Sequence, residues 1–411
     1  MKFCRDTNRY AVLASAMACM LVMGIYYDYS LIQPVVMQYF RVDSAAAGLP
    51  FSILIAAFCI GNFTGAMIRR RSSLPATLAA GYGLMIAGLA LTALLPPECF
   101  WAMPFTYGVI FGIGDGIIYN AVLALMPKWF PDKKGVASGL TLGMMGLSAA
   151  IFSPVLGIWL RKYGFSGTYF AQIPVYAAAG AVGLLMLKDP PADGVKLKDV
   201  GQKNAALKIN EIFCSRTFWI LTGLYFCAVP AYLLLSALFV TFGAEKGLAF
   251  STAALGVSLA SLCQIAGRFI LPALSDVTGR KTAFTIGFLI STAAAVVLSV
   301  SSGALYILCF CMLSFSYGGI QACFTPTIAD SFGTDNVGTV LSLTMAGLAA
   351  GSLGASLVLR NAGISAAILC AGAVSFIGVI LVCILPGEKR AACAGRRFCP
   401  NGLPLKRGRQ Q

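Results

Sequence analysis

Long apolar segments separated by short polar breaks run through almost the whole chain. A membrane-spanning helix needs about 20 mostly apolar residues, and twelve windows of that length fit between the breaks. Their approximate bounds are 10–31, 46–68, 74–95, 101–126, 135–160, 168–187, 216–241, 250–273, 281–301, 304–329, 337–359 and 363–385. The pattern therefore predicts an all-α membrane protein with twelve transmembrane helices.

The longest polar interval covers residues 188–215 and leaves six apolar windows on each side. This division predicts an N-terminal six-helix bundle over residues 1–187, a cytoplasmic linker loop over 188–215 and a C-terminal six-helix bundle over 216–385. Residues 386–411 follow as a basic cytoplasmic tail.

The two halves share short stretches, as duplicated bundles would. Tyr107 and Gly108 in the fourth window recur as Tyr317 and Gly318 in the tenth, and GVASGLTLGMMG from Gly135 returns loosely as GTVLSLTMAGLAAG. Parallel repeats of this kind occur in a large class of transporters, whose substrate site lies near the bilayer midplane between the halves. We therefore expect two pseudo-repeat bundles with a site between them.

Glycines recur at helical spacing in the fourth and fifth windows. The positions are 108, 112 and 116, followed by 135, 139, 143 and 146. Faces of small residues let helix backbones approach closely. The stripes predict tight contacts that allow the two halves to close together, and the spacing leaves open whether these contacts slide or stay static.

Composition supports a membrane location. Of the 411 residues, 58% are hydrophobic and 11% are charged, whereas an ordinary soluble domain has about 45–50% and about 25%. Twenty-four of the 30 Lys and Arg residues lie on the side of the termini and five on the other, which predicts that both termini are cytoplasmic. The net charge of +15 fits loops that face anionic lipid, so no nucleic-acid partner is expected.

Three ionisable residues lie inside the apolar windows, where charge is costly and usually functional: Asp28, Asp115 and Arg268. Arg268 stays charged and offers a planar set of donors that suits a carboxylate. Gln264 lies one turn earlier on the same face, so the two predict an anion pocket. A structural arginine that bonds to backbone carbonyls or to an aspartate of the other half is the alternative.

The two aspartates are candidates for proton coupling or charge balance. Asp115 lies at the middle of the fourth window, and its neighbours at spacing four are Phe111 and Tyr119. It is expected either to carry a proton or to balance Arg268 when the site is empty. Asp28 lies among tyrosines late in the first window, where a gate, a proton site and an interfacial aspartate in an aromatic belt are all open.

Charges also cluster at a predicted cytoplasmic turn. Asp276 is followed by Arg280 and Lys281 in GRFILPALSDVTGRK, and such a cluster can hold helix ends together electrostatically. The corresponding turn of the first half has Arg70 at the aligned position. We therefore predict a conformational latch at Asp276, Arg280 and Lys281 that the first half does not duplicate.

Several stretches resemble a known transporter family. GRFILPALSDVTGRK resembles the loop between the eighth and ninth spans of the major facilitator superfamily. YGVIFGIGDGIIYNAVLALMPKWFPDKKGVASGL is similar to the fourth-to-fifth span signature of its oxalate/formate antiporter family, and GIYYDYSLIQP, NEIFCSRTFWIL and YGGIQACFTPTIADSFG agree with that family in order. The resemblance covers all twelve windows.

The resemblance implies a carrier of small carboxylates that works by alternating access. It implies that Arg268 contacts the substrate and that Tyr27 and Tyr317 line the site. Tyr119 and Gln321 complete the candidate substrate-binding residues.

The sequence departs from the family in two places. Oxalate-type members tend to carry a lysine in the eleventh span, where this chain has Met345 and Ala346, and Asp115 stands where a small or apolar residue is expected. Both changes make the region more negative and disfavour a dianion. We therefore predict secondary transport of a small monocarboxylate such as formate, lactate or pyruvate, proton-coupled or by exchange.

Other functions remain open at this stage. Oxalate/formate or other dicarboxylate exchange, efflux of hydrophobic or cationic compounds, and a membrane sensor that signals through the basic tail are the alternatives. The chain has no histidine, and neither a nucleotide loop nor a nucleophile–base pair is recognisable, so an enzyme is not expected. No cofactor or metal is predicted, and the expected partners are a small carboxylate anion, protons and the lipid bilayer, with the protein a monomer.

Overall fold

The computed structural model describes residues 8–190, 207–248 and 250–386, and within these residues the ordered elements are helices. The expected tail over 386–411 and most of the expected linker over 188–215 lie outside the described residues.

The N-terminal half begins with a helix in three parts. Elements α1 (Arg9–Met23), η1 (Gly24–Asp28) and α2 (Tyr29–Phe40) follow one another without a gap. The other elements of this half are α3 (Ser44–Arg71), α4 (Leu74–Ala93), η2 (Phe100–Ala102), η3 (Pro104–Phe111), α5 (Gly112–Trp129) and α6 (Lys134–Met186). Helix starts carry the expected caps, since the Asp43 side chain accepts from Ala46 N at the start of α3 and Ser73 caps α4 in the same way.

The C-terminal half begins with the short helix α7 (Ile209–Phe213). It continues with α8 (Arg216–Ala228), α9 (Pro230–Glu245), α10 (Phe250–Thr278), α11 (Arg280–Val300), α12 (Gly303–Phe332), η4 (Thr334–Asn336) and α13 (Val337–Ile384). Gly279 and Gly333, which have φ of 93° and 83°, make the turns that separate α10 from α11 and α12 from η4.

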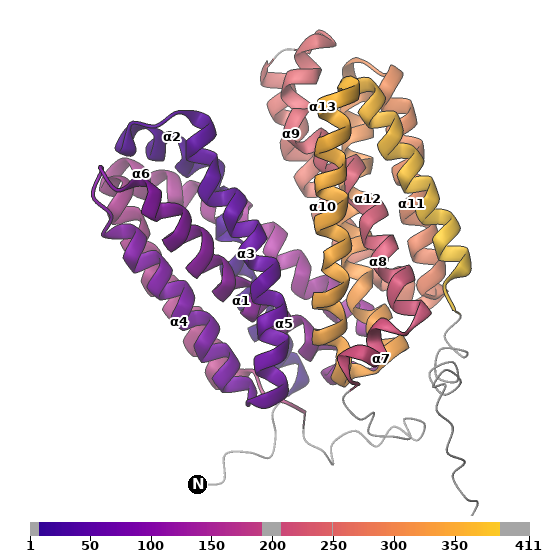
Figure 1. Cartoon of the computed structure of the whole chain (residues 1–411), viewed down its shortest axis with the longest axis horizontal. Helices are drawn as coiled ribbons and strands as arrows, with labels where there is room; N and C mark the ends of the chain where they lie inside the picture. Colours follow the sequence, from indigo (N-terminus) through magenta and orange to yellow (C-terminus); the bar gives the residue numbers. More distant parts are fainter. Residues whose placement is uncertain (1–7, 191–206, 249, 387–411) are drawn as a thin grey trace, which may run out of the picture.

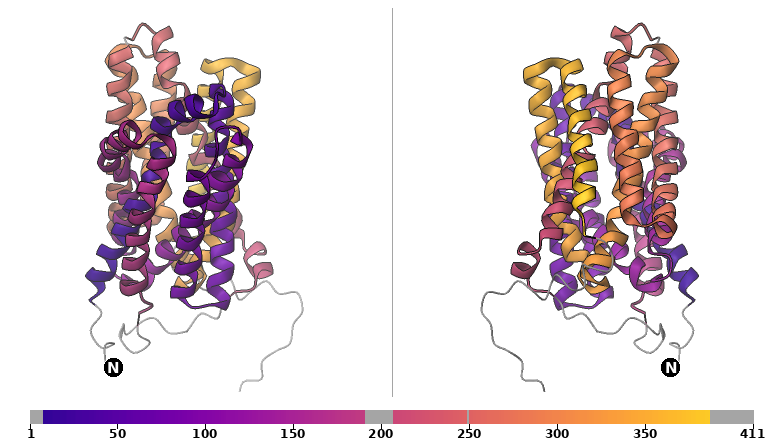
Figure 2. Two further views of the ribbon diagram at one scale, coloured as in Figure 1. Left: turned by 90° about the vertical axis from the view of Figure 1, so that its left-hand side faces the viewer. Right: turned by 90° about the vertical axis from the view of Figure 1, so that its right-hand side faces the viewer.

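The predicted windows match these elements, with differences at the helix breaks. Helix α6 contains two windows, because Gly164 has non-helical φ of 63° and ψ of −158°. Helix α13 contains the last two windows, and its ribbon turns back on itself (Figures 1 and 2). The seventh window is divided between α8 and α9, and the first was predicted too short, because helical structure continues to Phe40. By length and hydropathy alone, nine helical segments of the described chain are candidate membrane spans.

The two halves form separate bundles that lean apart (Figure 1). They converge at the end of the molecule where the chain begins, near α5 and α7, and diverge toward the end that carries α2 and α9. We call these the closed end and the open end. Helices α6 and α10 pack together across the junction of the halves, as do α3 and α13.

The two glycine stripes have different neighbours. At Gly108, Gly112 and Gly116, an added Cβ would lie within 3.1 Å of backbone oxygens of α3 in the same half. The expectation that these three glycines let the halves close together is therefore wrong. At Gly135 and Gly139, an added Cβ would lie 2.1 and 2.5 Å from backbone oxygens of α10. The second stripe is the one at the junction of the halves.

We predict that Gly116→Val destabilises the N-terminal half, because its Cβ would lie 2.1 Å from the Phe58 carbonyl oxygen. Overpacking of this kind costs about 1–3 kcal/mol, so the melting temperature in detergent should fall by several degrees. Gly83→Val on α4 is the control, since a Cβ there meets no atom within 4 Å. Equal melting temperatures for the two variants would contradict the close contact between α3 and α5.

Candidate functional site

Arg268 lies on α10 at the junction of the two halves and is only 3% exposed. One guanidinium nitrogen donates to the Leu142 carbonyl oxygen of α6 at 3.3 Å, and another reaches the Gln321 side-chain oxygen at 3.5 Å. Its Nε atom has no hydrogen-bond partner, and none of the ion pairs between described residues includes Arg268. A buried cation with long, neutral contacts is under-compensated and attracts an anion.

Aromatic side chains of both halves surround this guanidinium. Tyr27, Tyr119 and Tyr317 are all close enough to interact with its charge. Tyr27 and Tyr119 belong to the first half, and Tyr317 belongs to α12 of the second. Tyr27 is 39% exposed, whereas Tyr119 and Arg268 are each 3% exposed, so Tyr27 is the member of the group that is most accessible.

The structure adds Tyr232 of α9, which the sequence reasoning missed. Its ring stacks on Tyr317 with centroids 4.4 Å apart, its hydroxyl pairs with Gln264, and it interacts with the charge of Arg268. The signal in the sequence was weak, because Tyr232 is one of several aromatics in an apolar window. Only the packing of α9 against α12 brings it beside Tyr317.

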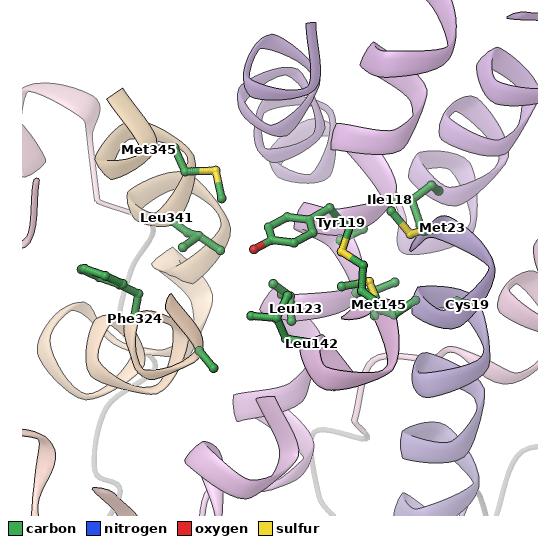
Figure 3. Close-up of a cluster of buried hydrophobic side chains, with 14 of the residues drawn as sticks. Cys19, Met23, Ile118, Tyr119, Leu123, Leu142, Met145, Phe324, Leu341 and Met345 are labelled. Atoms are coloured by element: carbon green, nitrogen blue, oxygen red, sulfur yellow. The ribbon is translucent and has the colours of Figure 1, made fainter. Parts of the chain in front are cut away.

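An apolar cluster adjoins the site across the junction. Figure 3 shows Tyr119 with its hydroxyl directed toward the helix that carries Leu341 and Met345. Met345 is 2% exposed, whereas Ala346 is exposed. Of these two positions, where family members tend to have a lysine, Met345 is therefore the one that faces the site.

The charge-balance hypothesis requires Asp115 to contact Arg268, and the structure shows no such contact. It is completely buried in the N-terminal half, and the charged or titratable groups that interact with it are tyrosines of that same half: Tyr26, Tyr82, Tyr107 and Tyr176. Neither carboxylate oxygen of Asp115 has a hydrogen-bond partner among the described residues, and none of the ion pairs between them joins it to Arg268. Direct balancing of Arg268 by Asp115 is therefore not part of this arrangement.

Asp28 is also inside the N-terminal half. It is 3% exposed, and one of its oxygens accepts a hydrogen bond from Ser153 of α6 at 2.5 Å. An exposed interfacial aspartate does not fit this burial. Asp28 is near Tyr107 and Tyr176 but outside the group of hydroxyls around Arg268.

Asp276 joins the two halves at the closed end. Its two carboxylate oxygens accept from the backbone N–H groups of Gly135 and Val136, each at 2.9 Å, at the start of α6. The first N–H groups of a helix have no partner within it and favour a negative charge. Asp276 of α10 therefore completes a helix of the other half.

Arg280 extends this contact into a charge network. It pairs with Asp276 at 2.6 Å and with Asp330 of α12 at 2.8 Å, and Asp330 pairs in turn with Lys134 of α6 at 2.5 Å. Lys281 is separate, because its ammonium group donates to the Cys383 carbonyl oxygen within the second half. The structure therefore groups Asp276 and Arg280 with Asp330 and Lys134, and it leaves Lys281 out.

A second group of cross-contacts lies where the first half has Arg70. This arginine donates to the Thr339 hydroxyl at 2.9 Å and to the Leu207 carbonyl oxygen at 2.7 Å. The Leu207 N–H in turn donates to the side chain of Asn336 at 2.9 Å. The contacts at the two corresponding turns therefore differ. At the turn of the second half, a carboxylate binds the start of a helix of the first half. At the turn of the first half, an arginine binds the second half and also the end of the linker.

Comparison with known proteins agrees with this architecture. The model of the Major Facilitator Superfamily matches residues 12–355. The chain belongs to the Major Facilitator Superfamily. It is 27% identical over 385 residues to the oxalate:formate antiporter of Oxalobacter formigenes, covering 90% of each chain. It is 24% identical over 356 residues to the uncharacterized MFS-type transporter YhjX of Escherichia coli, covering 84% of this chain and 86% of that one.

Solved structures of the superfamily share the fold. The fucose:proton symporter FucP of E. coli superposes with a TM-score of 0.72 at 15% identity, covering 91% of this chain and 98% of that one. The expected fold class, an all-α membrane protein with two six-helix pseudo-repeats, is confirmed, and the chain is a multi-pass membrane transporter of this superfamily.

We predict that Asp276→Asn loosens the closed end of this superfamily member, because it removes the charge that pairs with Arg280 and with the start of α6. The distance between labels at positions 71 and 277, measured by electron–electron resonance in a variant without native cysteines, should shift toward longer values. Asp189→Asn is the matched control, since Asp189 pairs with Arg69 of its own half. An unchanged distance distribution in Asp276→Asn would show that the network does not hold the halves together.

Proposed function

We propose that the chain transports a small monocarboxylate across the membrane by alternating access, with Arg268 as the group that binds the carboxylate. The observation that carries this proposal is a buried arginine at the junction of the halves, without a carboxylate partner among the described residues. Neutral donors surround it, so a bound anion would supply the charge that the protein itself does not. Membership in a transporter superfamily supports a carried substrate.

The charge of the site favours one negative charge on that substrate. Among the described residues, Arg268 is the basic residue that interacts with Tyr119, Tyr232 and Tyr317. Met345 stands where the resemblance to oxalate-type members implies a second cation. Two unit charges about 4 Å apart interact by about 4 kcal/mol at an effective dielectric near 20. A dianion would retain one uncompensated charge here, whereas a monoanion would be neutralised.

The neutral groups give the site its selectivity. Gln264 and Gln321 offer amide donors near the guanidinium, and Tyr27, Tyr119, Tyr232 and Tyr317 offer hydroxyls and ring faces. Carboxylate recognition by a guanidinium fork is strongest when both oxygens are engaged. The aromatic faces would then contact the short carbon chain of lactate or pyruvate.

Alternating access gives a role to the contacts of Asp276, Arg280, Asp330 and Lys134 at the closed end. With both termini in the cytoplasm, the closed end is cytoplasmic and the site faces outward in this conformation. Opening to the inside would require Asp276 to leave the start of α6 and Lys134 to leave Asp330, while the divergent ends carrying α2 and α9 approach each other. The side chains of these ion pairs are only 9–20% exposed. On opening they would return to water, and their recovered solvation offsets much of the lost attraction, so such a latch can open reversibly.

Oxalate and formate exchange is the second candidate. The relative from Oxalobacter formigenes, with its 27% identity over 90% of each chain, favours it. The apolar side chain of Met345, at the position where oxalate-type members tend to have a lysine, argues against it. Counterflow of labelled oxalate in proteoliposomes, with formate as the competing substrate, separates the two candidates.

We expect Arg268→Lys to weaken carboxylate binding by ten- to a hundredfold, because lysine lacks the bidentate fork. Thermal stabilisation by formate, lactate and pyruvate should be lost at concentrations that stabilise the wild type. Arg161→Lys serves as control, since Arg161 is exposed outside the site. Transport that is unaffected by Arg268→Lys and Arg268→Ala would instead support efflux of neutral or cationic compounds.

We expect Met345→Lys to broaden the substrate range to oxalate, because it places a second cation beside Tyr119. Oxalate counterflow should rise at least tenfold over the wild type, and formate should compete less well. Met345→Leu, which keeps the position apolar, should behave like the wild type. If the wild type already exchanges oxalate as fast as Met345→Lys, the monocarboxylate proposal is wrong.

A further inference from the structure

Asp115 has a place in the molecule that the proposed anion site does not use. Its side chain is 0% exposed, and neither carboxylate oxygen has a hydrogen-bond partner among the described residues. An isolated ionised carboxylate in a protein interior is too costly to persist, and such a group takes up a proton instead. Asp115 is therefore a neutral acid in this conformation.

The groups that face Asp115 come from every element around it, and all are neutral near pH 7. They are Tyr26 of η1, Tyr107 of η3, Tyr82 of α4 and Tyr176 of α6. Helix α1 contributes Cys19, whose thiol donates to the Ala179 carbonyl oxygen at 3.6 Å. From α3, the described residues contribute no titratable group that interacts with Asp115. No lysine or arginine among the described residues therefore stabilises an ionised Asp115.

Two tyrosines connect this acid to the anion site. Tyr26 is close enough to Asp115 to feel its charge, and the ring centroids of Tyr26 and Tyr27 lie 4.4 Å apart. Tyr27 in turn is close enough to Arg268 to interact with its charge. Tyr26 is 3% exposed and Tyr27 is 39% exposed, so the series runs from the buried acid to the solvent-accessible site.

We propose that Asp115 is a proton-binding site separate from the anion site, and that Tyr26 and Tyr27 couple its protonation to carboxylate binding at Arg268. The inference rests on the proposed function, since it assigns the proton that accompanies the same anion. When the site faces outward, a proton from the solvent near Tyr27 adds to one carboxylate oxygen of Asp115 by way of the tyrosine hydroxyls. After the site has opened to the other side, the proton leaves Asp115 by the same hydroxyls, so one proton crosses the membrane with each anion.

The direction of coupling follows from the hydroxyl dipoles. An ionised Asp115 attracts the hydroxyl proton of Tyr26, whose oxygen then accepts the proton of Tyr27. Tyr27 consequently presents only lone pairs to the site and repels a carboxylate. A neutral Asp115 releases this orientation, so Tyr26 donates to Tyr27 and Tyr27 can donate to the substrate. Protonation of Asp115 therefore favours binding, and anion and proton travel together.

The first test is independent of substrate. Infrared spectra of the purified full-length protein should contain the C=O stretch of a protonated carboxylic acid that disappears in Asp115→Asn. The asparagine is nearly isosteric with a neutral acid, so the variant should fold. If the spectrum of Asp115→Asn retains the whole acid band, Asp115 is not the protonated group and the inference is wrong.

The second test measures the coupling. Formate, lactate and pyruvate are titrated calorimetrically into the wild type, in buffers of different ionisation enthalpy, from pH 5.5 to a pH above the one at which the free protein loses the acid band of Asp115. Where the band is present, Asp115 is already protonated, so affinity should be constant and no proton should be taken up. Above that pH, one linked proton predicts an affinity that falls up to tenfold per pH unit, with uptake that approaches one proton per anion. Asp115→Asn should bind with little pH dependence and no proton uptake, and Tyr26→Phe should bind with a weakened pH dependence.

Controls separate the inference from the proposed function. Tyr169→Phe removes another buried, unpartnered hydroxyl of the same half that does not interact with Asp115, and it should behave like the wild type. Full pH dependence in Asp115→Asn would mean that the substrate itself carries the proton, and dependence on sodium instead of pH would mean a cation site. Both results overturn the coupling. Failure of the wild type to bind any of the three anions refutes the proposed function, while the infrared test still decides whether Asp115 holds a proton.

Discussion

The contact between α6 and α10 is the constraint on which the rest of this structure depends. Two glycines of α6 allow the backbones to approach until a Cβ at Gly139 would lie 2.5 Å from the Arg268 carbonyl oxygen. The same stretch of α10 carries the Arg268 side chain into the junction and, two turns later, the Asp276 carboxylate onto the start of α6. The anion-binding candidate and the main cross-link of the closed end are therefore parts of one helix, with Pro272 between them.

The two kinds of electrostatic contact at the junction differ in how their charges are compensated. The ion pairs at the closed end join side chains that are 9–20% exposed, and each carboxylate there has a cation partner. Arg268 is as deeply buried, but no ion pair between described residues includes it, and an unpaired buried charge is costly. The compensated charges therefore lie at the closed end, and the uncompensated one lies in the candidate site.

The N-terminal half contains a different unusual group, the buried acid Asp115. Gly108 of η3 and Gly112 and Gly116 of α5 pack closely against α3, and Asp115 lies buried among tyrosines. This packing determines where the acid lies. No lysine or arginine of the described residues pairs with it.

The sequence alone was sufficient for the fold class, the twelve apolar windows and the candidate residues, because hydrophobic length and intramembrane charges are properties of single segments. It identified Arg268, Asp115 and Asp276 as unusual. Contacts between segments far apart in the chain were beyond its reach. Helix packing places Tyr232 in the candidate site and adds Asp330 and Lys134 to the contacts of Asp276 and Arg280. It leaves Lys281 outside those contacts and separates Asp115 from Arg268. Each outcome depends on which helix faces meet. A local pattern determines which side chains are costly to bury, and only the tertiary structure determines what they are buried against.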